Sequence, residues 1–198
     1  MGSPSPRETW INFASFFASI FPILSTSDAH PPTTMPDITT LAARLTDPDP
    51  AARLAAAEQL AQAGEAAAPA AVPLVKACGD ADDQVREQAV AALEELGPPP
   101  TAAIDDLVSL VAATDPLTSY WAITLLGRSG QAAAAAVAAL TARLGSTSAP
   151  EVAQRAAWAL GKIGPAAGSA AVALRTATAS TDPRLARLAG EALAAVGG

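Results

Sequence analysis

The sequence predicts an all-α fold, a right-handed α-solenoid of five two-helix repeats over residues 37–198. Three observations support this prediction: a glycine that recurs at a nearly constant interval, apolar positions that recur in the same register, and a composition rich in alanine and poor in aromatic residues. A two-helix unit cannot bury its apolar face alone, so it stacks on its neighbours. We therefore expect each repeat to be stabilised by the repeats beside it.

The glycine column defines the length of the repeat. The glycines lie 33 or 34 residues apart and are Gly64, Gly97, Gly130, Gly164 and Gly197. Three apolar columns keep the same register: Ala56, Ala89, Ala122, Ala156 and Ala189; Leu60, Leu93, Leu126, Leu160 and Leu193; and Leu41, Leu74, Leu107, Leu140 and Leu174. These columns predict repeats at about 37–64, 65–97, 98–130, 131–164 and 165–198.

The second helix of each repeat has a clear start and stop. Asp49, Asp115 and Asp182 each precede a proline, and Asp82-Asp83 and Ala149-Pro150 are the variants of this step. An aspartate caps the free N–H groups of a helix start, and proline fits the first helical position because no N–H is needed there. The column glycine then ends the helix by adopting a left-handed conformation.

The first helix of each repeat is less regular. We expect these helices at residues 38–45, 66–78, 102–113, 132–144 and 166–178. Pro69 and Pro73 lie in the second of them, and Pro73 is expected to bend that helix or delay its start, because proline removes a helical hydrogen bond.

The composition excludes several kinds of site. Cys78 is the only cysteine, so no internal disulfide can form, and we expect it to be a buried structural residue rather than a nucleophile. His30 is the only histidine, so this chain alone cannot assemble the usual zinc or di-iron ligand sets. We expect no catalytic residue, no metal and no cofactor.

Two acidic clusters are the remaining candidates for a cation site. They consist of Asp80, Asp82 and Asp83, and of Asp105 and Asp106. Such carboxylates can hold a hard cation, but they also cap helices and solvate turns. Capping and solvation are the favoured interpretation.

The charge is distributed unevenly along the chain. Residues 1–116 contain 5 Lys and Arg against 16 Asp and Glu, whereas residues 117–198 contain 7 against 3. This asymmetry indicates a polar partner or end-to-end self-association, and it argues against a nucleic-acid partner, which requires a strongly basic stripe. Solvated helix faces of drifting composition are the alternative explanation.

The outward positions of the second helices suggest a binding surface. They are Arg53, Glu58, Gln62, Glu87, Glu94, Glu95, Tyr120, Thr124, Arg128, Gln154, Trp158, Lys162, Arg187 and Glu191. Aromatic residues rimmed by cations are typical of residues that dominate binding energy. The candidate partner-binding residues are therefore Tyr120, Trp121, Arg128, Arg155, Trp158 and Lys162. The alternative is that Trp121 and Trp158 fill gaps left by alanines.

Two of the repeats resemble a known family. The segments DDQVREQAVAALEELG (82–97) and APEVAQRAAWALGKIG (149–164) resemble the signature of short HEAT-like repeats found in phycobilisome-lyase-type proteins and many bacterial scaffold proteins. The resemblance covers residues 37–198 and implies an armadillo-type α-solenoid. It also implies that the arginine after the helix start, at Arg53 and Arg86, ties neighbouring repeats together. Repeats three to five carry Ser119, Ala153 and Ala186 instead.

The resemblance leaves three functions open. The leading one is a non-enzymatic scaffold that binds a protein or peptide on the concave face of the solenoid. The second is a lyase-type or chaperone-like accessory subunit, which needs a bound tetrapyrrole or a second subunit, and the third is a self-assembling structural component. Deoxyhypusine hydroxylase-like proteins need His–Glu iron motifs and alkylpurine glycosylase-like proteins need a basic DNA groove, so neither fits this sequence.

Residues 1–36 do not belong to the repeat pattern. Residues 10–24, WINFASFFASIFPIL, hold Trp10 and all four phenylalanines, and a Ser, Thr and Pro-rich linker follows. This apolar run is short for a membrane span, which needs about 20 residues. Three interpretations remain: a disordered or untranslated extension before Met35, an export signal within residues 1–29, and a helix that binds a membrane or partner. We expect a cytoplasmic protein, or an exported one if the signal is genuine.

Overall fold

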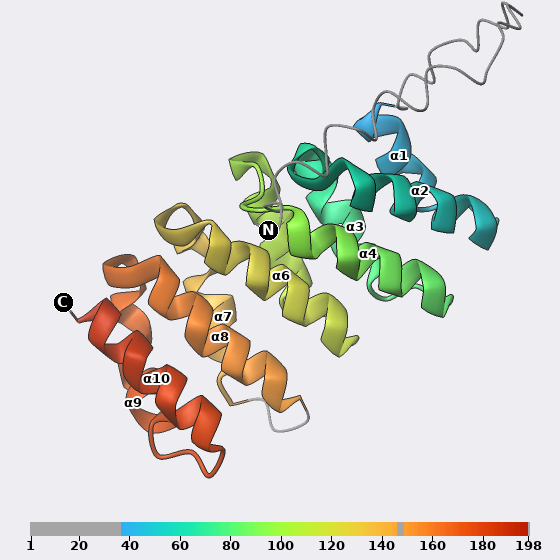
Figure 1. The fold of residues 1–198 in the computed structure, drawn as a ribbon. Helices are drawn as coiled ribbons and strands as arrows, with labels where there is room; N and C mark the ends of the chain where they lie inside the picture. The colour runs from blue at the N-terminus through green and yellow to red at the C-terminus, as the bar shows by residue number, and fades with distance from the viewer. Residues whose placement is uncertain (1–36, 146–148, 198) are drawn as a thin grey trace, which may run out of the picture. The chain divides into compact units, whose positions relative to one another are not determined.

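The computed structural model describes residues 37–145 and 149–197 of the chain. All expectations for residues 1–36, including the export signal and the membrane helix, lie outside the described residues. Within the described part, the protein is an all-α solenoid without β-strands (Figure 1). None of its described helices combines the length and the apolar character needed to cross a bilayer.

Five longer helices form one layer of the solenoid in the described part of the chain. They are α2 (Pro50–Ala63), α4 (Asp83–Glu95), α6 (Pro116–Arg128), α8 (Pro150–Ile163) and α10 (Pro183–Val196), and they follow one another in chain order (Figure 1). Four of them begin with an aspartate whose side chain accepts a backbone N–H, whereas Ala149 before α8 provides no such cap. The predicted start signals are therefore realised at Asp49, Asp82, Asp115 and Asp182.

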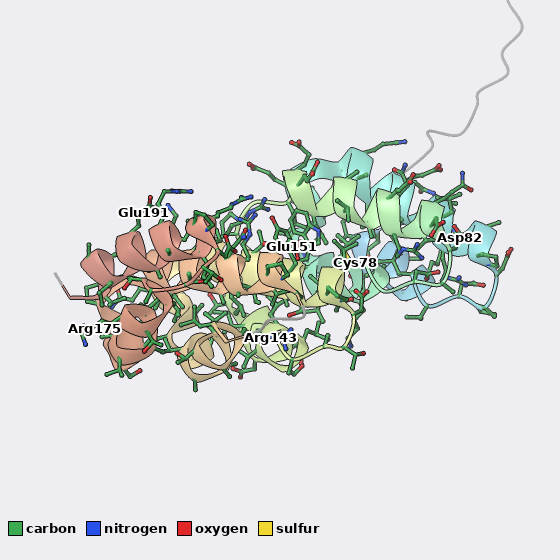
Figure 2. The ribbon with its side chains drawn as sticks, turned by 90° about the horizontal axis from the view of Figure 1, so that it is seen from below. Cys78, Asp82, Arg143, Glu151, Arg175 and Glu191 are labelled. Atoms are coloured by element: carbon green, nitrogen blue, oxygen red, sulfur yellow. The ribbon has the colours of Figure 1, made fainter. Side chains whose placement is uncertain are left out.

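The first helices form the other layer (Figure 2). Most of them are split in two. A 3₁₀ segment leads into a short α-helix in η2 (Gly64–Ala70) with α3 (Ala71–Ala77), η3 (Thr101–Ala103) with α5 (Ile104–Leu110), η4 (Gly130–Ala136) with α7 (Val137–Arg143), and η5 (Gly164–Ala170) with α9 (Ala171–Ala177). In the first repeat, the described residues place α1 (Ile38–Arg44) in this layer. Pro73 lies in the first turn of α3, so it delays that helix without kinking it.

The column glycines have the expected positive φ at four of five positions. Gly64 and Gly164 have φ of 54° and 71°, but their ψ of −130° and −141° differs from the left-handed helical value. Such a conformation is open essentially to glycine alone. Gly197 differs, because its φ is −100°.

The apolar columns form the core between the two layers. The alanine column and the column that begins at Leu41 are fully buried in every repeat. The leucine column is buried from Leu60 to Leu160, whereas Leu193 is half-buried because α10 packs against α8 on one side only. Most of the side chains in this core are small, as the composition predicted.

The packing between repeats is uneven. Helix α2 packs closely on α4, α6 on α8, and α8 on α10, but α4 and α6 scarcely touch, and repeat three meets repeat two mainly through α3 and α6. A groove of about 450 Å³ between α4 and α6 is lined by Val90 and Leu117 with Asp83, Arg86 and Glu87. The described array therefore consists of repeats one and two, and repeats three to five, joined by a loose junction.

Polar ties between repeats follow the same division. Arg53 donates two hydrogen bonds to the Asp80 carboxylate, at 2.7 Å and 2.8 Å, which links repeat one to repeat two. Arg86 was expected to make the next link, and this expectation is wrong: it bonds the Asp80 carbonyl and the Asp83 carboxylate of its own repeat. In repeat three, the residue equivalent to Asp80 is Ala113, whose side chain has no carboxylate.

Candidate functional site

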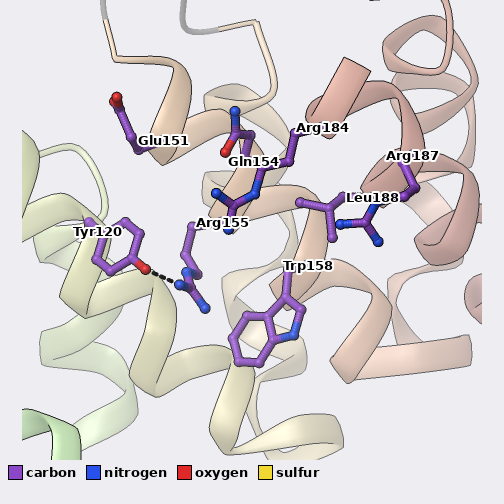
Figure 3. Close-up of a pocket in the computed structure, with 8 residues that line it drawn as sticks. All are labelled: Tyr120, Glu151, Gln154, Arg155, Trp158, Arg184, Arg187 and Leu188. Atoms are coloured by element: carbon purple, nitrogen blue, oxygen red, sulfur yellow. Dashed lines mark hydrogen bonds between the residues drawn. The ribbon is translucent and has the colours of Figure 1, made fainter. Parts of the chain in front are cut away.

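Arg155 lies between two aromatic rings on the face of the second helices (Figure 3). Its guanidinium carbon is 4.4 Å from the centroid of the Tyr120 ring and 5.0 Å from that of the Trp158 ring. Its Nη2 donates a hydrogen bond to the Tyr120 hydroxyl. Tyr120 belongs to α6 and Trp158 to α8, so these contacts join repeats three and four. The stacking and the hydrogen bond together hold the guanidinium plane in place.

Trp158 is positioned by a glycine on the neighbouring helix. A Cβ atom at Gly127 of α6 would lie 2.3 Å from Cζ3 of Trp158, so only glycine leaves room for the ring. Lys162 lies on the same helix as Trp158, with its Nζ 5.9 Å from the centroid of that ring. Trp158 is half-buried, and we call Tyr120, Arg155, Trp158 and Lys162 the aromatic–cation cluster.

Two shallow pockets adjoin this cluster. The first, of about 160 Å³, is lined by Arg155, Arg184 and Arg187 together with Tyr120, Trp158 and Leu188 (Figure 3). The second, of about 240 Å³, is lined by Lys162, Ala192 and Ala195 and again by Trp158 and Leu188. Both therefore lie against α8 and α10, and the Trp158 ring borders each of them.

Two of the predicted residues lie elsewhere. Trp121 is 6% exposed and packs edge-on against Tyr120, with 5.9 Å between the ring centroids. Arg128 stacks on Trp121 and donates to the carbonyls of Leu93 and Glu94, so it fastens α6 to the end of α4. The structure brings together Tyr120, Arg155, Trp158 and Lys162, while Trp121 and Arg128 support them from the other side.

One outward position was predicted wrongly. Thr124 is 4% exposed, and its hydroxyl donates to the Tyr120 carbonyl. Helix α6 is buried around most of its circumference, including Thr118, Ser119 and Gly127, so its polar residues do not mark a solvent face. The hydroxyls of Ser119 and Thr124 donate to backbone carbonyls and that of Thr118 donates to the Asp115 carboxylate, which makes this burial tolerable.

The charges in the first pocket are poorly balanced. Arg187 pairs with Glu191 at 2.5 Å, but neither Arg155 nor Arg184 has a carboxylate within 4.0 Å among the described residues. Burial lowers the pKa of Arg155 from its ordinary value, and the nearby Arg184 charge adds to that effect. Arginine stays charged all the same, so the pocket holds a half-buried cation that forms no ion pair, with Glu151 as the one carboxylate in the lining.

The other sequence candidates do not form a chemical site. Cys78 is fully buried, and this burial raises its pKa to about 12, so its sulfur stays a neutral thiol at physiological pH. Asp82 caps α4, and the Asp80 carboxylate accepts from Arg53. Within residues 37–145 and 149–197, no three His, Cys, Asp or Glu side chains are grouped so that they could hold a metal ion.

The family follows from comparison with known proteins. The HEAT repeat model matches this chain over residues 71–161 and again over 104–194, which together exceed half its length. The chain belongs to the HEAT repeat family. The HEAT repeat protein described here therefore carries its aromatic–cation cluster within the matched residues. No curated protein matches the sequence.

Several solved structures resemble this HEAT repeat protein. The crystal structure of one engineered protein has a TM-score of 0.58 and 26% identity, over 81% of this chain and 79% of the other. A second engineered protein gives 0.57 and 24%, over 81% and 48%. A designed armadillo repeat protein in complex with the peptide (KR)4 gives 0.56 and 21%, over 80% and 81%. These likenesses support the solenoid fold.

Sequence reasoning missed part of the pocket. Arg184 and Leu188 of α10 were not among the candidates, and Gly127 was not singled out at all. Helical periodicity shows which face of α10 is outward, but not which residues of α8 it meets. The sequence signal for Gly127 is a glycine in the last turn of a helix, three residues before the column glycine Gly130, where glycine lowers helix propensity.

Proposed function

We propose that this protein is a non-enzymatic scaffold that binds a protein or peptide through the face of its second helices. The observation that carries the proposal is the aromatic–cation cluster, in which half-buried Tyr120, Arg155 and Trp158 border one open pocket and Trp158 also borders a second. Tyr, Trp and Arg dominate the binding energy of protein interfaces because they offer large, rigid contact areas with polar ends.

The comparisons support this kind of partner. One of the similar solenoids is a designed armadillo repeat protein in complex with the peptide (KR)4. A row of parallel helices presents side chains at regular intervals, which suits an extended segment of another chain. We propose the same general use here, with the contacts centred on α6, α8 and α10.

Self-assembly is a second candidate, favoured by the distribution of charge. Helices α2 and α4 carry Arg53 and Arg86 against five acidic residues, whereas α6, α8 and α10 carry five basic residues against Glu151 and Glu191. Opposite charges at the two ends could attract a second copy. This candidate predicts oligomers that grow with concentration and dissociate in salt, because screening weakens such contacts.

Affinity capture tests the scaffold proposal. The full chain is immobilised and exposed to an extract of its native host, beside a Tyr120→Ala/Trp158→Ala double variant. The expected result is a protein retained by the wild type and lost by the double variant. Circular dichroism must show that both chains keep the same helicity and cooperative melting.

A surface control completes the experiment. Val172 is exposed on α9, in the opposite layer, so Val172→Ala removes apolar area away from the cluster. It should retain the same protein as the wild type. Equal retention by the wild type and the folded double variant would show that Tyr120 and Trp158 only pack the array, and the proposal would be wrong.

A further inference from the structure

We propose that the first pocket recognises a carboxylate of an acidic peptide segment, with Arg155 as the central donor. This inference rests on the proposed scaffold function and specifies the chemistry of its partner. It follows from three features: the orientation of Arg155, the charges around the pocket, and the apolar surface beside it.

The orientation of Arg155 leaves donors free for a ligand. Among its described contacts, its one hydrogen bond runs from Nη2 to the Tyr120 hydroxyl, while the two rings hold the guanidinium between them. A guanidinium presents five N–H donors in a plane, and a carboxylate matches two of them at once. Because the rings already fix this plane, little conformational freedom is lost when a carboxylate binds.

The surrounding charges favour an anion over a cation. The pocket contains Arg155, Arg184 and Arg187 against Glu151, and Arg187 is already paired with Glu191. The second pocket adds Lys162 beside Glu191. Burial lowers the pKa of Arg155, and repulsion from Arg184 adds to that effect, so an anion between the two arginines relieves repulsion as well as pairing with a half-buried charge.

The surface beside the arginines favours a peptide over a free ion. Trp158 and Leu188 border both pockets, and Ala192 and Ala195 continue the apolar surface along α10. A small anion would leave that surface open to water. A peptide segment can place a carboxylate on Arg155 and its neighbouring side chains over Trp158.

Fluorescence anisotropy with labelled peptides tests the inference on the full chain. The probes are (DE)4, its neutral isostere (NQ)4 and the cationic (KR)4. We expect (DE)4 to bind at least about tenfold more tightly than (NQ)4, since charge-assisted pairing dominates at such a site. Affinity should fall as salt is raised from 50 to 300 mM, because screening weakens partly exposed pairs.

Three variants locate the binding on Arg155. Arg155→Gln should weaken (DE)4 binding about tenfold, as expected for a central interface arginine. Arg155→Lys should recover only part of the affinity, since it keeps the charge but loses the planar fork. Arg175→Gln is the matched control, because Arg175 is exposed on α9 in the opposite layer (Figure 2), and it should change the affinity less than twofold.

The outcomes separate this inference from the scaffold proposal. Binding of (NQ)4 as tight as that of (DE)4, or equal losses in Arg155→Gln and Arg175→Gln, would overturn the acidic-ligand inference. If affinity capture through Tyr120 and Trp158 still succeeds, the scaffold proposal stands without it. Two further outcomes would also overturn the carboxylate inference. One is that a serine-phosphorylated peptide binds while (DE)4 does not, and the other is that (DE)4 binds only by dissociating a dimer of this chain.

Discussion

At the residue scale, Gly127 is the position where α6 accommodates a side chain of α8. An added Cβ would lie 2.3 Å from the Trp158 ring, whereas a Cβ at Gly190 of α10 would meet nothing within 4 Å. Gly127→Ala should therefore force the ring out of place and destabilise the fold by about 1–3 kcal/mol. Gly190→Ala should stabilise it by up to about 1 kcal/mol through helix propensity.

Chemical denaturation and tryptophan fluorescence together measure this pair. The two substitutions add the same methyl group, so helix propensity alone predicts equal stabilisation. Equal stabilisation, with unchanged tryptophan emission in Gly127→Ala, would show that Trp158 does not rest on α6.

The Arg53–Asp80 pair makes stability depend on pH. Its side chains are 15% and 10% exposed, and the hydrogen bonds from Arg53 lower the pKa of Asp80. A carboxyl with a lowered folded-state pKa stabilises the fold above its unfolded pKa of about 3.9, and that contribution is lost as pH falls through the folded value. Asp80→Asn should cost about 1–3 kcal/mol at pH 7, and the difference should shrink below about pH 4.

Urea denaturation at a series of pH values checks the Asp80 prediction. Asp105→Asn serves as the control, because Asp105 is exposed and makes no side-chain hydrogen bond or ion pair among the described residues. If both variants show the same pH profile, Asp80 is not specifically stabilised by Arg53.

At the element scale, the capping aspartates differ in the number of hydrogen bonds that their side chains accept. Asp49 accepts one hydrogen bond, from the Ala51 N–H, whereas Asp182 caps Arg184 and Leu185 and also accepts from Gln154 of α8 at 2.6 Å. Asp182 therefore starts one helix and ties it to another. Asp49→Ala should cost about 0.5–1 kcal/mol through the lost cap, and Asp182→Ala should cost more because it also loses the hydrogen bond from Gln154.

A double-mutant cycle separates the two roles of Asp182. Unfolding free energies of Asp182→Ala, Gln154→Ala and the double variant should give a coupling of at least about 0.5 kcal/mol. Additive costs would mean that the bond to Gln154 contributes nothing beyond the cap.

Local rules explain which helices could be predicted from the sequence. The aspartate starts were placed correctly because a cap depends on residues within a single turn of helix, and the alanine column because it recurs in the same register in every repeat. The 3₁₀ entries of the first helices were not predicted, and they occur before α7 and α9 without a proline like Pro73. Gly127 was missed for another reason: its neighbour is Trp158 of α8, which lies far along the chain.

The candidate site shows the same limit. Tyr120 and Trp158 could be chosen because large aromatics are rare in this sequence, and Arg155 because it stands near Trp158 in the chain. The contribution of Arg184 and Leu188 depends on how α10 packs beside α8. Residue periodicity gives the face of a helix, and the stacking of repeats decides which faces meet.

At the scale of the whole described array, the loose junction between α4 and α6 should divide stability into two parts. Repeat proteins are stabilised by interfaces between neighbours, so a weak interface lets each side open separately. Native-state hydrogen exchange should show one free energy of opening for α1 to α4 and another for α5 to α10. A single value for all helices would contradict this division.

Arg128 is the residue that tests the junction directly. Its guanidinium donates to the carbonyls of Leu93 and Glu94 across the junction. Arg128→Ala should widen the gap between the two opening free energies and broaden the urea transition. Lys162→Ala, which removes an exposed cation away from the junction, should leave both unchanged.

The alanine column has a consequence for which substitutions this chain tolerates. A core of large side chains is damaged by losing atoms, since truncation leaves cavities. Here the buried column from Ala56 to Ala189 has little to lose, because each side chain is one methyl group, but each position is fully buried in a close-packed interior. Substitutions that enlarge a side chain are therefore the damaging ones. One added methyl group pushes a whole helix outward, and stacking passes that shift to the next repeat. Neutral substitutions are thereby confined to the outer surfaces. The rim of the first pocket is free to vary, while the packed array beneath it stays fixed.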